Sequence, residues 1–475
     1  MLFSSLEFLF AFLPAVVVGY FLLPKSARNY WLLLGSLFFY AWGEPKFLFA
    51  MLLSIVFNYF MALHIEELEK GSLVQKGLLA VTVLGNLGLL FAFKYLNFVI
   101  RVTHQLIPAT QEMFPQTEIL LPIGISFFTF QALSYVIDVY RGIPAQHNIC
   151  HLGLYISLFP QLIAGPIVRY TTIADQIQTR QVTTELFSKG LLRFVRGFNK
   201  KVLLSNILAE VADKAFGFQG LSVGMAWLGA VCYTLQIYFD FGGYSDMAIG
   251  LGQMFGFRFL ENFNYPYISK NVTEFWRRWH ISLGSWFLDY VYFPLGGSRV
   301  SSRGRLIFNL GVVWLATGIW HGANWTFILW GVLHGVVVIV EKLLGLPGKL
   351  EEHRVWTAVY RCFTLLVVVF GLVLFRAESL SAAVTYIKAM LGLGGGGLVD
   401  GTFLFYFRDY FIILLAGLLC STPLFRWAKE RLQARGTAAG EYGVLAGQAF
   451  QLLLFVVGVS CLVMNAHNPF IYFNF

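Results

Sequence analysis

Two histidines in apolar surroundings are candidates for acid–base chemistry. His321 lies in the motif WHGANW, residues 320–325, at the junction of the apolar runs 306–319 and 326–340, and His280 follows the aromatic and basic stretch FWRRW. Polar groups are costly inside a membrane and are usually kept there for function, and an imidazole exchanges protons near neutral pH. The pair therefore indicates acid–base catalysis, with proton relay, metal ligation or a hydrogen-bonded core histidine as alternatives.

Metal ligation is the weakest of these alternatives, and we predict no metal site. No further Cys, His or carboxylate lies at ligand spacing from either histidine. His334 follows His321 by 13 residues, too far along one helix for the rings to meet, and we interpret it as structural. The five cysteines are far apart and mostly lie in apolar segments, which favours small buried side chains: Cys150, Cys232, Cys362, Cys420 and Cys461.

The composition indicates a membrane protein in which these histidines lie in membrane-embedded segments. Of 475 residues, 57% are hydrophobic and only 12% are charged, which excludes a water-soluble core and shell. Apolar runs near the length of a membrane span recur at 6–23, 47–63, 78–100, 119–139, 223–239, 306–319, 326–340, 356–375, 403–419 and 445–464. We predict an all-α polytopic membrane protein with roughly 10–12 crossings plus re-entrant and interfacial helices, and a single membrane domain over residues 1–475.

The charge distribution predicts the topology. The formal net charge is +9, but the basic residues lie in short loops between apolar runs rather than in a stripe, which favours the positive-inside rule over nucleic-acid binding. Basic clusters at 189–201, 299–305 and 426–435 are predicted to be cytoplasmic, the first as a helix lying in the interface. Both termini are then extracytoplasmic, and the first apolar run is an anchor rather than a cleaved signal peptide.

Two segments interrupt the regular pattern of spans. Residues 158–166 carry two prolines and a glycine, which predicts a re-entrant segment that includes Gln161 and lines a cavity. Residues 274–287, if helical, place Trp276 and His280 on one face at i,i+4 with Arg277 beside them, as an interfacial belt or a cavity site. Asp240, near a Gly-Gly pair, is a functional candidate or a hydrogen-bonding group at a helix break.

Three motifs resemble the membrane-bound O-acyltransferase family: residues 275–283, 292–297 and 318–325. The resemblance extends to residues 3–5, 39–42, 122–127, 160–161 and 238–246, and so covers nearly the whole chain. It is strongest toward the bacterial branch that acylates exported glycans, as alginate, cellulose and peptidoglycan O-acetyltransferases do.

The resemblance implies a fold and a set of roles. It implies tilted helices around a central funnel, His321 as the catalytic residue and His280 as a second important polar residue. The acyl donor is a cytoplasmic thioester, acetyl-CoA or an acyl carrier, with no bound cofactor. A neutral His321 is then suited to act as base toward a hydroxyl. The residues expected to shape the substrate tunnel are Trp320, Asn324, Trp325, Trp276, Arg277, Asp240 and Gln161.

The chain ends in the aromatic sequence HNPFIYFNF, within a tail of residues 465–475. This tail is too short to cross the membrane again, and an aromatic plug at the interface is one interpretation. It also resembles an FxYFxF-type motif of related glycan O-acylation systems, in which the tyrosine is proposed to carry the acyl group. That resemblance makes Tyr472 a candidate acyl carrier, assisted by His321 and handing the group to an extracytoplasmic esterase-like transferase.

Together these features predict an acetyltransferase of the cytoplasmic membrane that serves an exported glycan. A lipid or protein O-acyltransferase is the alternative within enzymes. A proton-coupled transporter, with the two histidines as relay, is the alternative outside them. An inverted repeat favours transport, and none is evident in the sequence.

Overall fold

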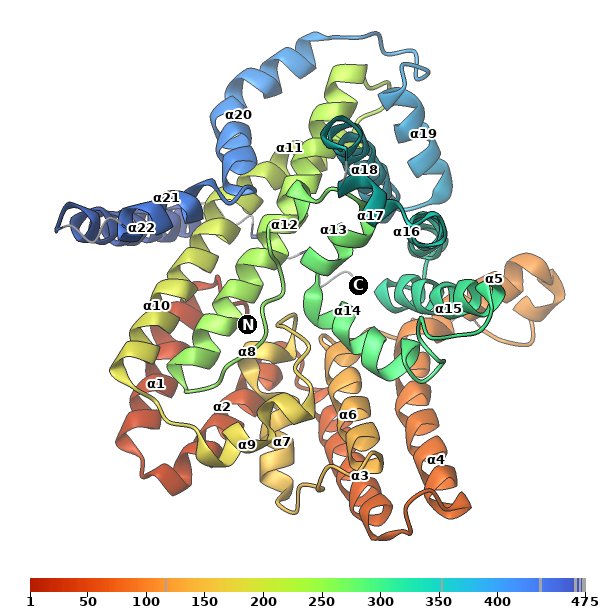
Figure 1. Ribbon diagram of the computed structural model, residues 1–475, viewed down its shortest axis with the longest axis vertical. Helices are drawn as coiled ribbons and strands as arrows, with labels where there is room; N and C mark the ends of the chain where they lie inside the picture. Colours follow the sequence, from red (N-terminus) through yellow and green to blue (C-terminus); the bar gives the residue numbers. More distant parts are fainter. Residues whose placement is uncertain (116–117, 352, 435–437, 465–467, 470, 472–475) are drawn as a thin grey trace. The chain divides into compact units, whose positions relative to one another are not determined.

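A computed structural model describes residues 1–115, 118–351, 353–434, 438–464, 468–469 and 471. Within these ranges the chain is helical and contains no strand (Figure 1). Six described helical segments are long and apolar enough to cross a membrane: α3 (Leu48–Glu67), the continuous segment from α4 through α5 (Leu73–Leu106), α16 (Trp325–Leu344), α18 (Arg354–Arg376), α20 (Gly401–Cys420) and α22 (Ala438–Met464). The all-α, polytopic prediction is confirmed, while 10–12 crossings remain a prediction.

Two helices begin a few residues before their apolar runs because a capping side chain precedes each of them. Ser302 accepts a hydrogen bond from the Arg305 N–H and starts α15 (Arg303–His321). Asp400 accepts from the Phe403 N–H and starts α20. A cap satisfies a backbone donor that the first helical turn leaves without a partner.

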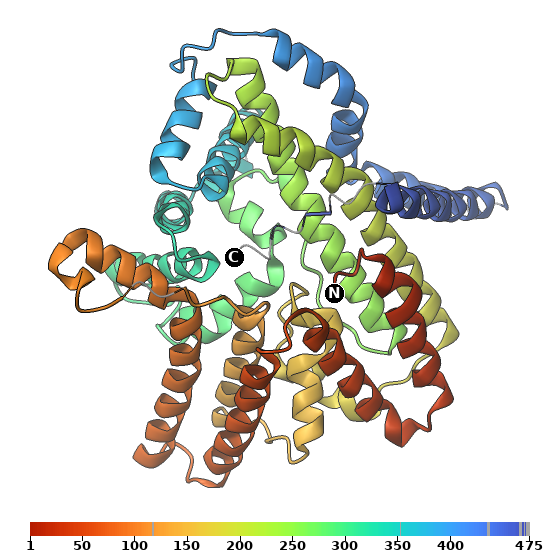
Figure 2. The ribbon, with the colours of Figure 1, turned by 180° about the vertical axis from the view of Figure 1, so that it is seen from behind.

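The chain divides into two compact units. The first unit comprises residues 1–191 and 248–260, and the second comprises residues 192–247 and 261–475. In the first unit, α3, α4 (Leu73–Leu90) and α6 (Ile125–Tyr140) pack against one another, and Figure 2 shows these helices from behind.

The first unit contains the predicted helix interruption. α7 (Ile149–Ser157) stops before Leu158, and the short α8 (Phe159–Leu162) follows with a proline in its first turn. The Gln161 side chain is buried and donates from Nε2 to the Tyr155 carbonyl, 2.5 Å away. A freed backbone carbonyl is thus satisfied inside protein, as an irregular segment in a membrane requires. The break is confirmed, and its return to the starting side remains a prediction.

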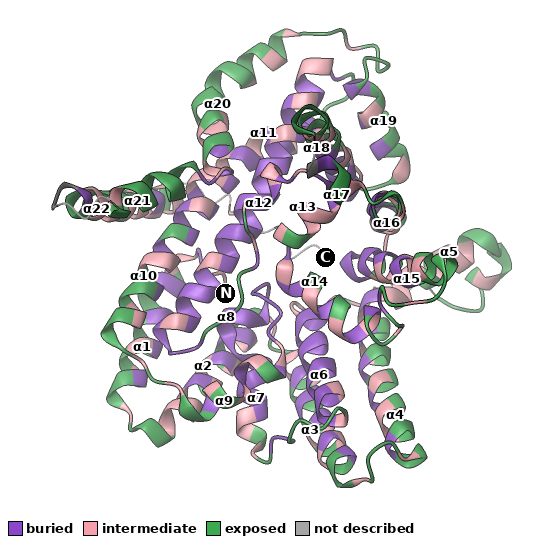
Figure 3. Ribbon diagram, in the orientation of Figure 1, coloured by how far each residue is buried: buried purple, intermediate pink, exposed green. Residues whose placement is uncertain are grey.

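α12 (Val223–Met254), of which residues 223–247 belong to the second unit, is buried over much of its length, as Figure 3 shows. α10 (Thr184–Asn199) packs closely on it, because a Cβ added at Gly197 would lie only 2.4 Å from the Gly243 carbonyl oxygen. The predicted helix over the first basic cluster therefore exists, and it has a protein partner along one side.

α15 and α16 form a tight antiparallel pair joined at residues 322–324. A Cβ at Gly331 would lie 2.6 Å from the Trp314 carbonyl oxygen, and one at Gly318 would lie 2.7 Å from the Phe327 carbonyl oxygen. Such close approach of two backbones is possible only with glycine at the contact. This packing fixes His321, at the end of α15, against α16.

α20 and α22 expose apolar side chains. Only 11% and 6% of their spanning windows are buried within the protein. Apolar surface of this extent is suited to hydrocarbon rather than water. Both helices therefore present lipid-facing surfaces.

Candidate active site

His321 is enclosed by aromatic rings. It is the last residue of α15 and is 4% exposed. Its ring centroid lies 4.8 Å from that of Trp320, 4.9 Å from Trp330 and 5.2 Å from Phe375, all near edge-to-face. These contacts hold the imidazole in one orientation and keep its surroundings apolar.

His280 lies at a break between two short helices, which Figure 1 shows as separate. α13 (Val272–Arg278) ends before it, and α14 (Ile281–Phe287) begins after it. The predicted i,i+4 pairing of Trp276 and His280 on one helix is therefore wrong. The physical reason is a neighbouring segment: the Asn264 N–H donates to the Arg278 carbonyl, and the Ile281 N–H donates to the Asn262 carbonyl.

The His280 backbone adopts a left-handed conformation, with φ 46° and ψ 51°. This conformation is unfavourable for a residue with a Cβ, and it persists where the surroundings enforce it. Asn262 provides that enforcement. Its Oδ1 lies 3.2 Å from His280 Nδ1 and accepts from the Ser282 N–H at 3.1 Å and the Ser282 hydroxyl at 2.9 Å. The sequence analysis missed Asn262, which lies 18 residues before the histidine that it orients.

One indole brings the two histidines together. The Trp320 ring centroid is 6.0 Å from His280 and 4.8 Å from His321. His280 is 1% exposed and Trp320 is 5% exposed. Residues from two distant motifs therefore share one buried cluster, while the catalytic pairing of the two histidines stays a prediction.

His334 belongs to the wall of the same cluster. Its ring contacts Trp330, the indole that also contacts His321. Trp276 Nε1 donates to His334 Nδ1 at 3.3 Å. Since an indole nitrogen is only a donor, Nδ1 of His334 carries no proton, and the ring is the Nε2–H tautomer. His334 thus orients Trp276, which agrees with a structural role.

Glu341 anchors α13 from the adjacent α16. Its side chain is fully buried, and its carboxylate accepts from the Val272 N–H at 2.8 Å, the Thr273 N–H at 2.7 Å and the Thr273 hydroxyl at 2.5 Å. A carboxylate at the start of a helix satisfies donors that have no partner within the helix. Sequence reasoning missed Glu341, a carboxylate that directly follows the apolar run 326–340.

Asp240 and Lys201 form a buried ion pair in the second unit. Lys201 Nζ lies 2.6 Å from Asp240 Oδ1, and each residue is 1% exposed. Lys201, which the sequence groups with the first basic cluster, is therefore buried against a carboxylate, while the cytoplasmic placement of that cluster remains a prediction. Such a pair requires further hydrogen bonds to offset the loss of hydration.

The C-terminal tail contributes those hydrogen bonds. Lys201 donates to the Pro469 carbonyl, and the Ile471 N–H donates to Asp240 Oδ2 at 2.9 Å. Ile471 is 5% exposed and packs in the core cluster that includes Tyr238 and Phe239. Tyr472 lies outside the described residues.

Four predicted tunnel residues lie outside the aromatic cluster. Trp325 is 48% exposed and Arg277 is exposed. Asn324 Oδ1 caps α16 by accepting from the Thr326 N–H, and its Nδ2 donates to the Glu378 carbonyl. The Asn324 amide therefore stabilises the α15–α16 turn. Gln161 belongs to the first unit.

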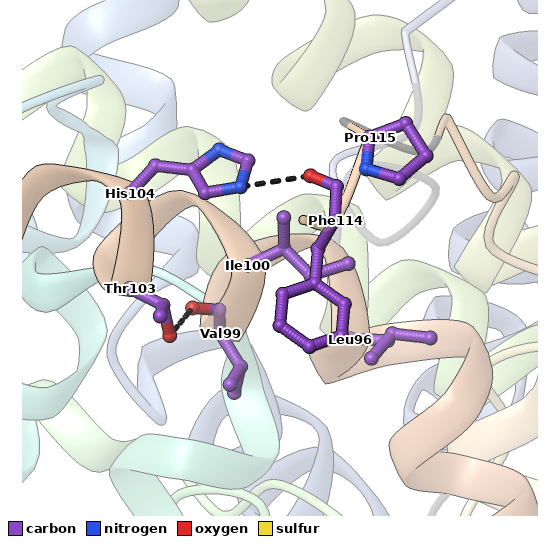
Figure 4. Close-up of a pocket in the computed structure, with 7 residues that line it drawn as sticks. All are labelled: Leu96, Val99, Ile100, Thr103, His104, Phe114 and Pro115. Atoms are coloured by element: carbon purple, nitrogen blue, oxygen red, sulfur yellow. Dashed lines mark hydrogen bonds between the residues drawn. The ribbon is translucent and has the colours of Figure 1, made fainter. Parts of the chain in front are cut away.

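A separate pocket of about 400 Å³ lies in the first unit (Figure 4). His104 Nε2 lies 3.0 Å from the Phe114 carbonyl at its edge. Its lining contains none of the predicted site residues: Leu96, Val99, Ile100, Thr103, His104, Phe114 and Pro115. Within the described ranges, no three His, Cys, Asp or Glu side chains gather as metal ligands would.

The fold and the site define a polytopic membrane protein with a buried histidine pair. Residues 70–358, more than half of the chain, match the family MBOAT, membrane-bound O-acyltransferase. The chain belongs to this family and is an O-acyltransferase.

Relatives in the family match over most or all of the chain. The probable alginate O-acetylase AlgI of Pseudomonas putida is 40% identical, with 100% of both chains covered. The AlgI protein of Pseudomonas aeruginosa is 46% identical over 83% of this chain and 75% of its own length. The peptidoglycan O-acetyltransferase of Helicobacter pylori is 37% identical over 83% of this chain and 80% of its own.

Replacing Asn262 tests whether it orients His280. In Asn262→Ala, we expect acyl transfer to fall by about 10- to 100-fold, because the His280 ring and the Ser282 N–H and hydroxyl lose their common acceptor. Initial rates of the purified protein measure the effect. Asn264→Ala is the matched control, since Asn264 is exposed and its recorded bonds use backbone atoms. Equal rates for the two variants would contradict the role of Asn262.

Proposed function

We propose that the protein takes an acetyl group from a cytoplasmic thioester, acetyl-CoA or an acyl carrier, and passes it across the cytoplasmic membrane for O-acetylation of an exported glycan. The relatives named as alginate O-acetylases and a peptidoglycan O-acetyltransferase support this acceptor class. The observation that carries the proposal is the buried histidine pair on one indole, Trp320.

His321 acts as the general base in this proposal. A hydroxyl oxygen attacks the thioester carbonyl carbon while its proton passes to the imidazole. The carbon–sulfur bond then breaks, and the departing thiolate takes the proton from the imidazolium. The aromatic enclosure supports this role because it orients the ring and limits competing hydrolysis by water.

His280 is the second polar residue of the site. Its left-handed backbone and its contact with Asn262 aim the ring toward Trp320 from a direction that a continuous helix cannot supply. In this proposal His280 hydrogen-bonds the donor or the acceptor, and Trp320 and Trp276 line the path. Trp325, Arg277 and Asn324 have no assigned contact with substrate.

Tyr472 carries the acetyl group in the proposed sequence. The attacking hydroxyl is its phenol, and the ester then passes to a glycan through an esterase-like partner outside the membrane. Support comes from Ile471, the preceding residue, which is bonded to Asp240 and buried in the second unit. In this proposal the C-terminus, like the N-terminus, lies on the extracytoplasmic side.

Labelling with radioactive acetyl-CoA tests the carrier step. We expect a covalent label on the wild-type protein, mapped by peptide mass spectrometry to Tyr472, and at least a tenfold loss of label in Tyr472→Phe. Tyr442→Phe, at a 70% exposed position, is the control and keeps the label. Donor turnover without label on Tyr472 would contradict the carrier and favour an aromatic plug. An intact donor and an unlabelled protein would contradict acyl transfer itself.

A further inference from the structure

The described part of the tail is held by a network of polar side chains. Asn206 Nδ2 donates to Asn468 Oδ1 at 3.1 Å, and Asn206 Oδ1 accepts from Lys201 Nζ at 2.9 Å. Lys201 pairs with Asp240 at 2.6 Å. The network therefore runs from the tail through Asn206 and Lys201 to Asp240, and its members come from the helical segment 200–217 and from α12.

Two of these contacts are made to the tail's backbone. Lys201 donates to the Pro469 carbonyl, and Asp240 accepts from the Ile471 N–H. The lysine presents only donors and the carboxylate only acceptors, so together they match a carbonyl and an N–H two residues apart. Asn206, by contrast, contacts the Asn468 side chain and so distinguishes one register of the tail from another.

The place of this network on α12 rules out an incidental surface contact. Asp240 lies 17 residues after the first residue of a 32-residue helix, about 25 Å along its axis. Ile471 is buried beside it, in a cluster with Leu208, Leu235 and Phe239. An isolated buried charge is very costly, so an ion pair here requires partners that complete its hydrogen bonds.

We propose that Lys201, Asp240 and Asn206 form a binding site for a peptide segment, and that residues 468–471 of the chain's own C-terminal tail dock there through Asn468, Pro469 and Ile471. The ion pair binds backbone atoms of the tail. The Asn206 side chain fixes the register of the tail by its bond to the Asn468 side chain. These residues position the tail and do not take part in bond making. The proposal concerns docking alone, so it stands whether or not Tyr472 carries an acyl group.

Disulfide crosslinking of the full chain in membranes tests this site. In a background without the five native cysteines, Asn206→Cys with Asn468→Cys should crosslink on mild oxidation, because the native side chains are in hydrogen-bond contact. Free thiols are counted after denaturation with a maleimide mass tag. Asn199→Cys with Asn468→Cys is the control pair. Asn199 bonds to Gln451 and lies about 10 Å from Asn206 along the helical segment. Equal crosslinking of both pairs would overturn the docking site.

Charge variants made in the Asn206→Cys, Asn468→Cys protein test the ion pair between Lys201 and Asp240. Asp240→Asn should slow crosslinking at least fivefold, because Lys201 loses the anion that holds it in place. Asp246→Asn is the matched control on the same helix, since Asp246 pairs with Arg193 and Lys200. If Asp240→Asn does not purify as a monodisperse protein, Lys201→Met with Asp240→Asn removes both charges and should slow crosslinking similarly. Unchanged rates in these variants, or equal slowing by Asp246→Asn, would overturn the proposal. No acyl donor is used, so the result is independent of the acetyl-transfer assay.

Discussion

His321→Ala is expected to lower the rate of acetyl transfer by about 10²- to 10⁴-fold, the range that removal of a general base produces. The physical reason is that the hydroxyl proton loses its acceptor at the moment of attack, while the apolar rings around the site supply no substitute. Initial rates with radiolabelled acetyl-CoA, at matched protein concentrations in detergent, measure the effect.

Two variants separate the chemical role of His321 from a packing role. His321→Gln fills a similar space without a basic nitrogen, so it should remain as slow as His321→Ala while its melting temperature stays close to wild type. His104→Ala, at a half-buried position in the first unit, should keep the wild-type rate. A His321→Gln protein with a rate within threefold of wild type would refute the assignment of His321 as base.

Glu341→Ala is expected to lower the free energy of unfolding by about 3 kcal/mol, because it leaves buried donors at the start of α13 without an acceptor. α13 carries Trp276 and leads directly into His280, so acyl transfer should also fall at least tenfold. A lower melting temperature in detergent and a slower initial rate are the two measurements.

The control for Glu341 is a carboxylate with an exposed partner. Glu430 pairs with Arg426 on α21 (Leu424–Ala434), where both side chains are more than half exposed, and Glu430→Ala should change stability little. Glu341→Gln keeps one acceptor oxygen and should fall between wild type and Glu341→Ala. Equal melting temperatures for Glu341→Ala and Glu430→Ala would exclude the capping role.

The helices were predictable because their signal is local. The apolar runs of spanning length correspond to α3, α16, α18, α20 and α22. The prolines of residues 158–166 correspond to the break before α8. The candidate histidines were also accessible, because a polar residue in an apolar run is conspicuous by itself. The break at His280 could not be predicted from the sequence. Hydrogen bonds with residues 262–264 outweigh the helical pattern of the segment that contains His280.

By itself, the sequence determined that this protein is an all-α membrane protein of the O-acyltransferase family, with His321 and His280 as its reactive candidates. Only the tertiary structure decided which groups contact and orient these two histidines. Asn262, Glu341 and Trp330 act through contacts between separate segments of the chain, and Lys201, one cation of the first basic cluster, is the buried partner of Asp240. The physical reason is that spanning helices are selected by local hydrophobicity, whereas the partner of a buried polar group is selected by packing between segments distant in the chain.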